Sequence, residues 1–151
     1  MSRPARPEEP GLAPAPAVLL EMVRTAFDAF NRRDVDGLLA LTTPDVVFET
    51  VTGRVLDRPE PYVGREGIER YFADIAAVWH TLIVEPVHIR LAGTSVFALG
   101  HACLEGPGGS FQDTASWIIT LRDDRAVRVQ VFGEERLARR ALGLPERPPA
   151  N

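Results

Sequence analysis

The chain has 151 residues, of which 45% are hydrophobic and 25% charged, a composition typical of a single globular domain. Its net charge of −4 disfavours nucleic acid as a partner, because nucleic-acid binders carry a basic excess. No apolar run approaches the roughly 20 residues that span a bilayer, and no signal-peptide pattern is present. A single cysteine, Cys103, excludes an intrachain disulfide. We therefore expect a cytoplasmic protein with neither a membrane nor a nucleic acid as its partner.

Prolines crowd both ends of the chain. Five of them fall within residues 1–16, and a further group begins at Pro145. Such segments hold neither a helix nor a central strand. The sequence therefore predicts a disordered arm over 1–16, a folded domain over 17–144 and a disordered tail over 145–151.

The first half of the domain is predicted to be mainly helical. Apolar residues recur at three- and four-residue steps before Asn31 and again after Gly64. Between these stretches, Asp34 is placed to cap a short helix that ends before Pro44. The predicted elements are helices over 19–31, 34–41 and 64–79, a strand over 46–51 and a loop over 52–61.

The second half has the pattern of an antiparallel sheet. Four strand-like segments are separated by short turn sequences at Ala92-Gly93, at Gly106-Pro107-Gly108-Gly109 and at Asp123-Asp124. These strands are predicted over 82–91, 95–104, 112–121 and 126–132, followed by a helix over 134–142 that Gly143 ends. Helices followed by such a sheet indicate an α+β fold, in which the leading helices cover the apolar face of the sheet.

Four stretches carry a resemblance to a known family. They are FDAFNRRDVDGLLAL, TPDVVFET, YVGREGIERYFADIAAVW and ASWIITLRDDRAVRVQVFGEERLARRALGL. Together they resemble the SnoaL-like domain of the nuclear transport factor 2-like superfamily, across nearly all of residues 18–144. The resemblance implies a cone-shaped α+β barrel, with a strongly curved, mostly antiparallel sheet around three N-terminal helices and a short C-terminal helix. Isomerases, epoxide hydrolases, polyketide cyclases, dehydratases and plain binding modules share this fold.

Strand alternation divides the predicted sheet residues into two sets. Similarity to ketosteroid isomerase, a member of the same superfamily, implies which set faces a small-molecule pocket. It directs His101, Arg128 and Gln130 inward, and it directs Val127, Val129 and Val131 outward, where they suggest a homodimer interface. The residues expected to line the pocket are Phe27, Phe30, Phe48, Thr50, Tyr71, Phe72, Ile75, Trp79, Phe97, Leu99, Cys103, Ala115, Trp117, Ile119 and Phe132.

The catalytic residues of ketosteroid isomerase have no equivalents here. Its tyrosine falls on Ala26, its aspartate base on Thr50, and its oxyanion-binding aspartate on Ala115, or on Ser116 after a one-residue slip. None of these residues supplies the acid, base and donor that the reaction needs. The sequence therefore excludes that constellation.

Two other chemistries of the superfamily offer candidates. The Asp–Arg–Asp set of limonene-type epoxide hydrolases matches poorly, with Asp113, Arg128 and the distant Glu49 as its nearest counterparts. Similarity to the polyketide cyclases implies His101 as the acid/base, because its unperturbed pKa lies near neutrality. Gln130 and Arg128 would then orient a carbonyl group, and Asp113 is a weaker candidate.

Three hypotheses for the function remain open. The first is a cyclase, isomerase or hydratase acting on a hydrophobic carbonyl compound. The second is a non-catalytic module that binds a small hydrophobic molecule, and the third is a dimerisation domain with a closed core. No cofactor is expected, since His80, His88 and His101 lack the paired spacing of metal ligands and no glycine-rich phosphate loop precedes a helix.

Overall fold

The computed structural model describes residues 11–51, 56–57 and 61–145. The first ten residues of the predicted arm, most of the predicted 52–61 loop and the predicted tail beyond Pro145 lie outside this part of the chain.

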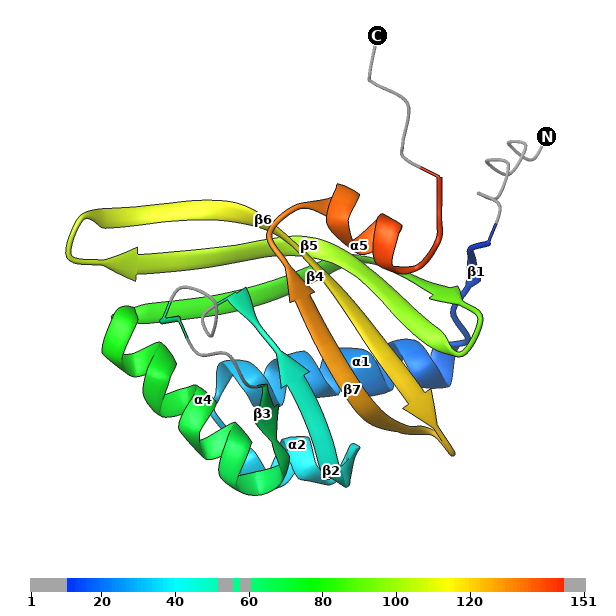
Figure 1. Ribbon diagram of the computed structural model, residues 1–151, viewed down its shortest axis with the longest axis horizontal. Helices are drawn as coiled ribbons and strands as arrows, with labels where there is room; N and C mark the ends of the chain where they lie inside the picture. Colours follow the sequence, from blue (N-terminus) through cyan, green and yellow to red (C-terminus); the bar gives the residue numbers. More distant parts are fainter. Residues whose placement is uncertain (1–10, 52–55, 58–60, 146–151) are drawn as a thin grey trace, which may run out of the picture.

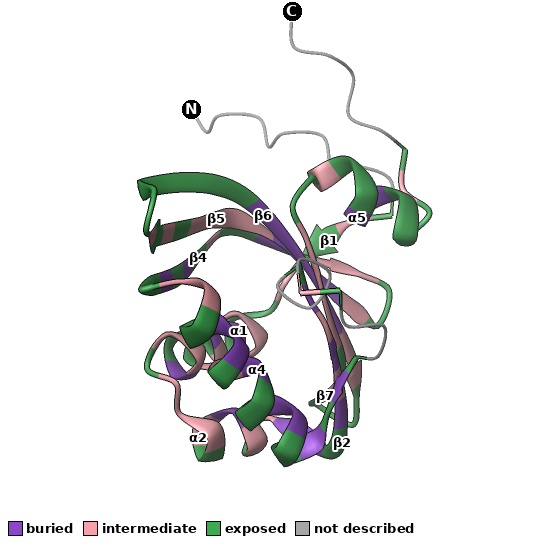
Figure 2. Ribbon diagram, turned by 60° about the vertical axis from the view of Figure 1, so that its left-hand side comes forward, coloured by how far each residue is buried: buried purple, intermediate pink, exposed green. Residues whose placement is uncertain are grey.

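A curved sheet wraps around three of the helices (Figure 1, Figure 2). The helices on its concave face are α1 (Ala17–Asn31), α2 (Val35–Leu39) and α4 (Gly64–Val78). A short C-terminal helix, α5 (Glu135–Ala141), lies on the opposite face. The prediction of an α+β fold with a curved sheet around N-terminal helices is confirmed.

Seven strands form the sheet in the order β1-β4-β5-β6-β7-β2-β3. They are β1 (Ala13–Pro14), β2 (Thr42–Glu49), β3 (Tyr62–Val63), β4 (Thr81–Ala92), β5 (Ser95–Gly106), β6 (Gly109–Arg122) and β7 (Arg125–Phe132). All neighbours pair antiparallel except β2 and β7, which run parallel. The sheet is open, because β1 and β3 form its two edges.

The structure corrects two predicted boundaries. Part of the expected arm is ordered, because Ala13 and Pro14 pair with the end of β4, and an edge strand tolerates proline. The strand predicted to begin at Val46 begins instead at Thr42 and runs through Pro44. The register with β7 is irregular between Thr42 and Val47, and this irregularity accommodates the proline.

The end of α1 is fastened to β4 by two side chains. Asn31 accepts a hydrogen bond from Val84 N and donates one to Val84 O, both at 2.9 Å, so its amide occupies an edge that β1 does not reach. Arg33 has a positive φ of 58° and donates to Leu82 O at 2.7 Å and to Phe30 O at 2.8 Å. Asp34 then caps α2 as predicted, accepting from Gly37 N at 2.9 Å.

Each face of the sheet has its own apolar cluster. The large cluster lies between the concave face and the helices, around Val23, Phe27, Ile68 and Trp117. A smaller cluster on the outer face joins Phe97, Ile118 and Ala138 beneath α5. We call this cluster, together with α5 and its residue Arg139, the outer cap.

Candidate functional site

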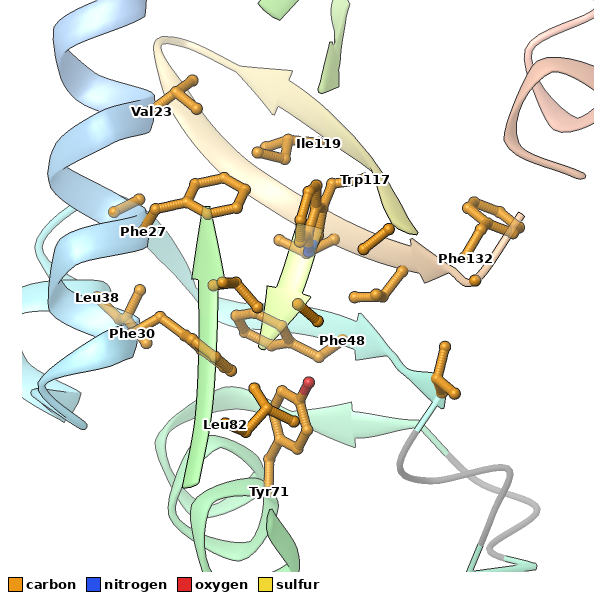
Figure 3. Close-up of a pocket in the computed structure, with 18 of the residues that line it drawn as sticks. Val23, Phe27, Phe30, Leu38, Phe48, Tyr71, Leu82, Trp117, Ile119 and Phe132 are labelled. Carbon is orange, nitrogen blue, oxygen red and sulfur yellow. The ribbon is translucent and has the colours of Figure 1, made fainter. Parts of the chain in front are cut away.

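A cavity of about 230 Å³ lies between the concave face of the sheet and helices α1 and α4 (Figure 3). Phe27 and Phe30 of α1 form one wall and Phe48 and Trp117 of the sheet form another. The rings of Phe27 and Trp117 meet edge to face, with centroids 4.7 Å apart. A cavity of about 150 Å³ is enough to hold benzene, so this one has room for a molecule of one or two rings.

Small residues on α1 and on the inner faces of the strands leave this space open. Ala26, Ala102, Ala115 and Ala126 all contribute to the lining. Gly100 also belongs to the inner face of β5, where a Cβ atom would come within 1.9 Å of the carbonyl oxygen of Glu85. Alanines opposite aromatic side chains therefore create the cavity.

Partly exposed residues form the mouth of the cavity. Trp79 and Phe111 contact each other edge to face at 5.6 Å, and Phe111 is 49% exposed. Val51, at 37% exposure, and the exposed Asp113 complete this rim. Asp113 is the only carboxylate in the lining formed by the described residues.

Tyr71 provides a polar group within the apolar wall. Its side chain is buried, and its ring contacts Phe30 and Phe48. Burial, followed by the neighbouring Tyr62, raises the pKa of the Tyr71 hydroxyl, and the positive charge of Arg33, followed by a hydrogen bond with Thr50, opposes that rise. The hydroxyl is therefore neutral at physiological pH and can donate a hydrogen bond.

Two buried residues, Tyr62 and Asp74, form a hydrogen-bonded pair beside the Tyr71 ring. Tyr62 stacks on Tyr71 with centroids 4.9 Å apart, and its hydroxyl donates to Asp74 Oδ2 at 2.6 Å. Asp74 is 7% exposed and lies on α4, three residues beyond Tyr71. This arrangement fixes the direction in which Tyr71 presents its oxygen.

Ten residues proposed from sequence do line the cavity. They are Phe27, Phe30, Phe48, Tyr71, Trp79, Asp113, Ala115, Trp117, Ile119 and Phe132. Three others lie just behind the lining. Thr50 hydrogen-bonds Tyr71, Phe72 packs against Phe30, and Ile75 is buried in the large cluster.

The direction predicted for β5 is wrong. Ala102 and Leu104 face the cavity, whereas His101 and Cys103 face outward. The other two residues predicted inward on this strand, Phe97 and Leu99, belong to the outer cluster. The bulkier side chains at this end of β5, Phe97 and Leu99, point outward because α5 covers that end of the outer face. The larger residues of the strand therefore did not identify its concave face.

The direction predicted for β7 is also reversed. Val129 and Val131 line the cavity, while Arg128 lies outside and donates to Glu49 Oε1 at 2.6 Å. Gln130 pairs with Ile118 of the outer cluster. Val127 is the extra residue of a bulge, and a one-residue slip moves a strand's side chains to the opposite face. The predicted interface through these valines is therefore wrong for Val129 and Val131; a homodimer through another surface stays a prediction.

The remaining lining residues were not predicted. They are Met22, Val23, Ala26, Leu38, Leu41, Thr42, Val51, Leu82, Val84, Ala102, Leu104, Phe111, Thr114, Ala126, Val129, Val131 and Gly133. Helical periodicity places Val23 on the same helix face as Phe27 and Phe30, so its place in the lining could have been predicted from the sequence. The bulges in β4 and β7 carry no comparable signal in the sequence.

Among the described residues, no group of three or more histidine, cysteine, aspartate or glutamate side chains is placed to hold a metal ion. Within the same ranges, no helix has the length and apolar character needed to cross a membrane.

A curved, open sheet around three helices, with a cavity between them, is the nuclear transport factor 2-like architecture. Residues 23–129 match the family model of the SnoaL-like domain. The chain therefore belongs to the SnoaL-like family. A search of curated proteins gives no match.

Several solved structures share the fold. A nuclear transport factor 2-like protein of unknown function from Burkholderia pseudomallei is 19% identical, with a TM-score of 0.69 over 84% of this chain and 98% of its own. TerC, co-crystallised with polyporic acid, gives the same identity and TM-score over 83% and 98%. A putative polyketide cyclase from Sinorhizobium meliloti is 23% identical, with a TM-score of 0.59 over 74% and 94%. At these identities the likeness shows the fold alone.

Proposed function

We propose that this protein binds a small, largely apolar organic molecule of one or two rings in the cavity between α1, α4 and the sheet. The observation that carries the proposal is an apolar cavity of about 230 Å³ with a neutral tyrosine hydroxyl in its wall. Its volume is just below the usual range for ligand sites, about 300–1,000 Å³. A compact ligand, with most of its surface buried, fits it best.

The character of the lining supports this choice. Burying an apolar ring against these side chains is favourable by about 25 cal/mol for each Å² removed from water. A ligand oxygen near Tyr71 would accept a hydrogen bond that water does not contest in an apolar site. TerC, which shares the fold, was co-crystallised with polyporic acid, a small organic molecule.

Filling the cavity tests the proposal directly. The variant Ala102→Leu adds bulk on the lining, whereas Cys103→Leu places the same side chain on the outer face of the same strand. Binding of naphthalene, followed by equilibrium dialysis, should occur in the parent protein and in Cys103→Leu and be lost in Ala102→Leu. Equal binding by both variants would contradict the proposed location.

A second candidate is proton transfer next to a carbonyl group. Asp113 and Tyr71 are both lining residues, and together they would supply a carboxylate base and a neutral donor to the carbonyl oxygen. The carboxylate would take an α-proton while Tyr71 donates to the developing enolate oxygen. This pair replaces His101 as the candidate acid/base machinery.

Hydrogen–deuterium exchange distinguishes catalysis from binding. A bicyclic ketone such as 2-tetralone, incubated with the protein in D2O, should exchange its α-protons faster if this pair is catalytic, and NMR follows the exchange. Asp113→Asn should abolish the acceleration and His101→Ala should preserve it. A bound ketone with no acceleration would leave binding as the function.

A further inference from the structure

Two neighbouring hydroxyl groups are buried without a partner. Thr42 is 4% exposed and Thr43 is 7% exposed, and within the described part of the chain neither Oγ1 atom has a hydrogen-bond partner. Buried hydroxyls of this kind are uncommon and destabilising, so each calls for an explanation. Only Thr42 lines the cavity. The pair therefore shares its chemistry and burial and differs in facing the cavity.

Thr42 lies at the end of the cavity that is remote from its mouth. It is the first residue of β2 and pairs with Ala126, near the start of the parallel strand β7. Both residues line the cavity, and Figure 1 shows β2 and β7 side by side. Ala126 is 6% exposed and the neighbouring Leu38 is 5% exposed. The partly exposed Val51 lies beyond the other end of β2. A ligand that enters through the mouth would meet Thr42 with its leading end.

We infer that Thr42 is a specificity-determining residue whose hydroxyl binds an oxygen at the buried end of an aromatic ligand. This inference rests on the proposed function and names the ligand class more closely, as a ring system with a hydroxyl or carbonyl group at its leading end. A threonine hydroxyl both donates and accepts, so it suits either group. Rotation between staggered side-chain rotamers is enough to turn Oγ1 toward the ligand.

The chemistry around Thr42 makes this choice selective. Apolar side chains such as Leu38, Leu41 and Ala126 offer no alternative partner to a buried ligand oxygen. A site with a buried polar group discriminates against an analogue that lacks the matching group, because the buried group then stays unpaired. The unpaired hydroxyl would thus lower stability in the free protein and favour one class of ligand in the complex.

A matched pair of probes and a matched pair of variants test the inference on the full chain. Equilibrium dialysis would compare 2-naphthol with naphthalene, which differ by one hydroxyl group. The parent protein should prefer 2-naphthol, and Thr42→Val should reduce that preference by about tenfold, the effect of one buried hydrogen bond. Thr42→Ser, which keeps the hydroxyl, and Thr43→Val, which removes a hydroxyl away from the cavity, should both retain the preference.

Thermal unfolding separates this role from a structural one. Both valine variants remove an unpartnered hydroxyl, so both should unfold at a higher temperature than the parent. If Thr42→Val keeps the preference for 2-naphthol, or Thr43→Val loses it equally, the inference is overturned. Naphthalene binding without a preference in the parent would overturn the inference and leave the proposed function standing. If neither probe binds, both fail.

Discussion

The inner and outer faces of the sheet are built from alternate residues of the same strands, yet they are filled differently. On β5 the inner face carries Ala98, Gly100 and Ala102, and a cavity remains beside it. The outer face carries Phe97, which is 2% exposed because α5 packs over it. On this part of β5 the larger side chain thus belongs to the closed face and the smaller ones to the cavity side.

The outer cap is held by more than apolar packing. Arg139 is 2% exposed, its guanidinium lies 5.6 Å from the centre of the Phe97 ring, and its Nε donates to Glu135 Oε2 at 2.6 Å. Such a face has little room for a ligand. The cavity lies on the inner face instead.

The largest expected effect comes from truncating the closed face. Phe97→Ala should lower the free energy of unfolding by about 3–5 kcal/mol, the range for a buried phenylalanine. Phe48→Ala, on the cavity wall, should cost less because one side of that ring already faces open space. Chemical denaturation measures both values. A larger loss for Phe48→Ala would reverse the comparison between the faces.

The next largest loss of stability should follow substitution of Gly100, where β4 and β5 approach each other closely. In Gly100→Ala the new methyl group would meet the Glu85 carbonyl oxygen at 1.9 Å, so the β4 bulge must shift. We expect a loss of about 1–3 kcal/mol, as for other overpacked sites. Gly108→Ala is the control, since nothing lies within 4 Å of its added Cβ. Equal stabilities of the two variants would show that the strands separate freely.

A smaller effect should appear at alkaline pH. The folded protein raises the pKa of Tyr71 above its ordinary value, so the folded state holds this proton more tightly than the unfolded state does. Stability from this group is complete below about pH 10 and falls as the pH rises above it. The chain has no lysine, which leaves few other groups that titrate there.

The free energy of unfolding of the parent and of Tyr71→Phe would be compared between about pH 8 and about pH 11. These values lie on either side of the ordinary tyrosine pKa of about 10. The phenylalanine variant should lose stability less steeply with rising pH. Identical slopes would show that Tyr71 is accessible to water in the folded protein.

The smallest effect is expected at the half-buried His101, on the part of the outer face that lies away from the cavity. His101→Ala should change stability by no more than about 0.5 kcal/mol, as is usual for surface substitutions. Naphthalene binding, measured by dialysis, should also stay unchanged, because His101 faces away from the cavity. Loss of binding in this variant would place His101 on the ligand's side of the sheet after all.

Local sequence signals predicted much of the fold. Asp34 caps α2, and Asp123 and Asp124 have positive φ values of 51° and 64° in the turn predicted for them. Alternation on β6 was assigned to the correct faces, with Trp117 and Ile119 in the lining. Each of these features depends on residues only a few positions apart.

The site was predicted less completely, for a physical reason. Val87 and Val127 are the extra residues at register shifts, and the strands realign at each of them. A single slip exchanges the two faces of a strand, so Arg128 and Gln130, which follow the bulge at Val127, were assigned to the wrong side. His101 lies on β5, whose register with β6 is unbroken, and there the larger residues Phe97 and Leu99 face the outer cluster instead of the cavity. Thr42 carried no local signal, because its importance comes from the distant residues that surround the same cavity.

The sequence by itself determined the α+β class, the helices, the hairpin turns and the aromatic character of the cavity wall, since periodicity and turn chemistry act over a few residues. Only the tertiary structure decided which faces of β5 and β7 meet the helices, that β2 and β7 run parallel, and that α5 closes the outer face. Those outcomes depend on bulges and on contacts between segments far apart in the chain.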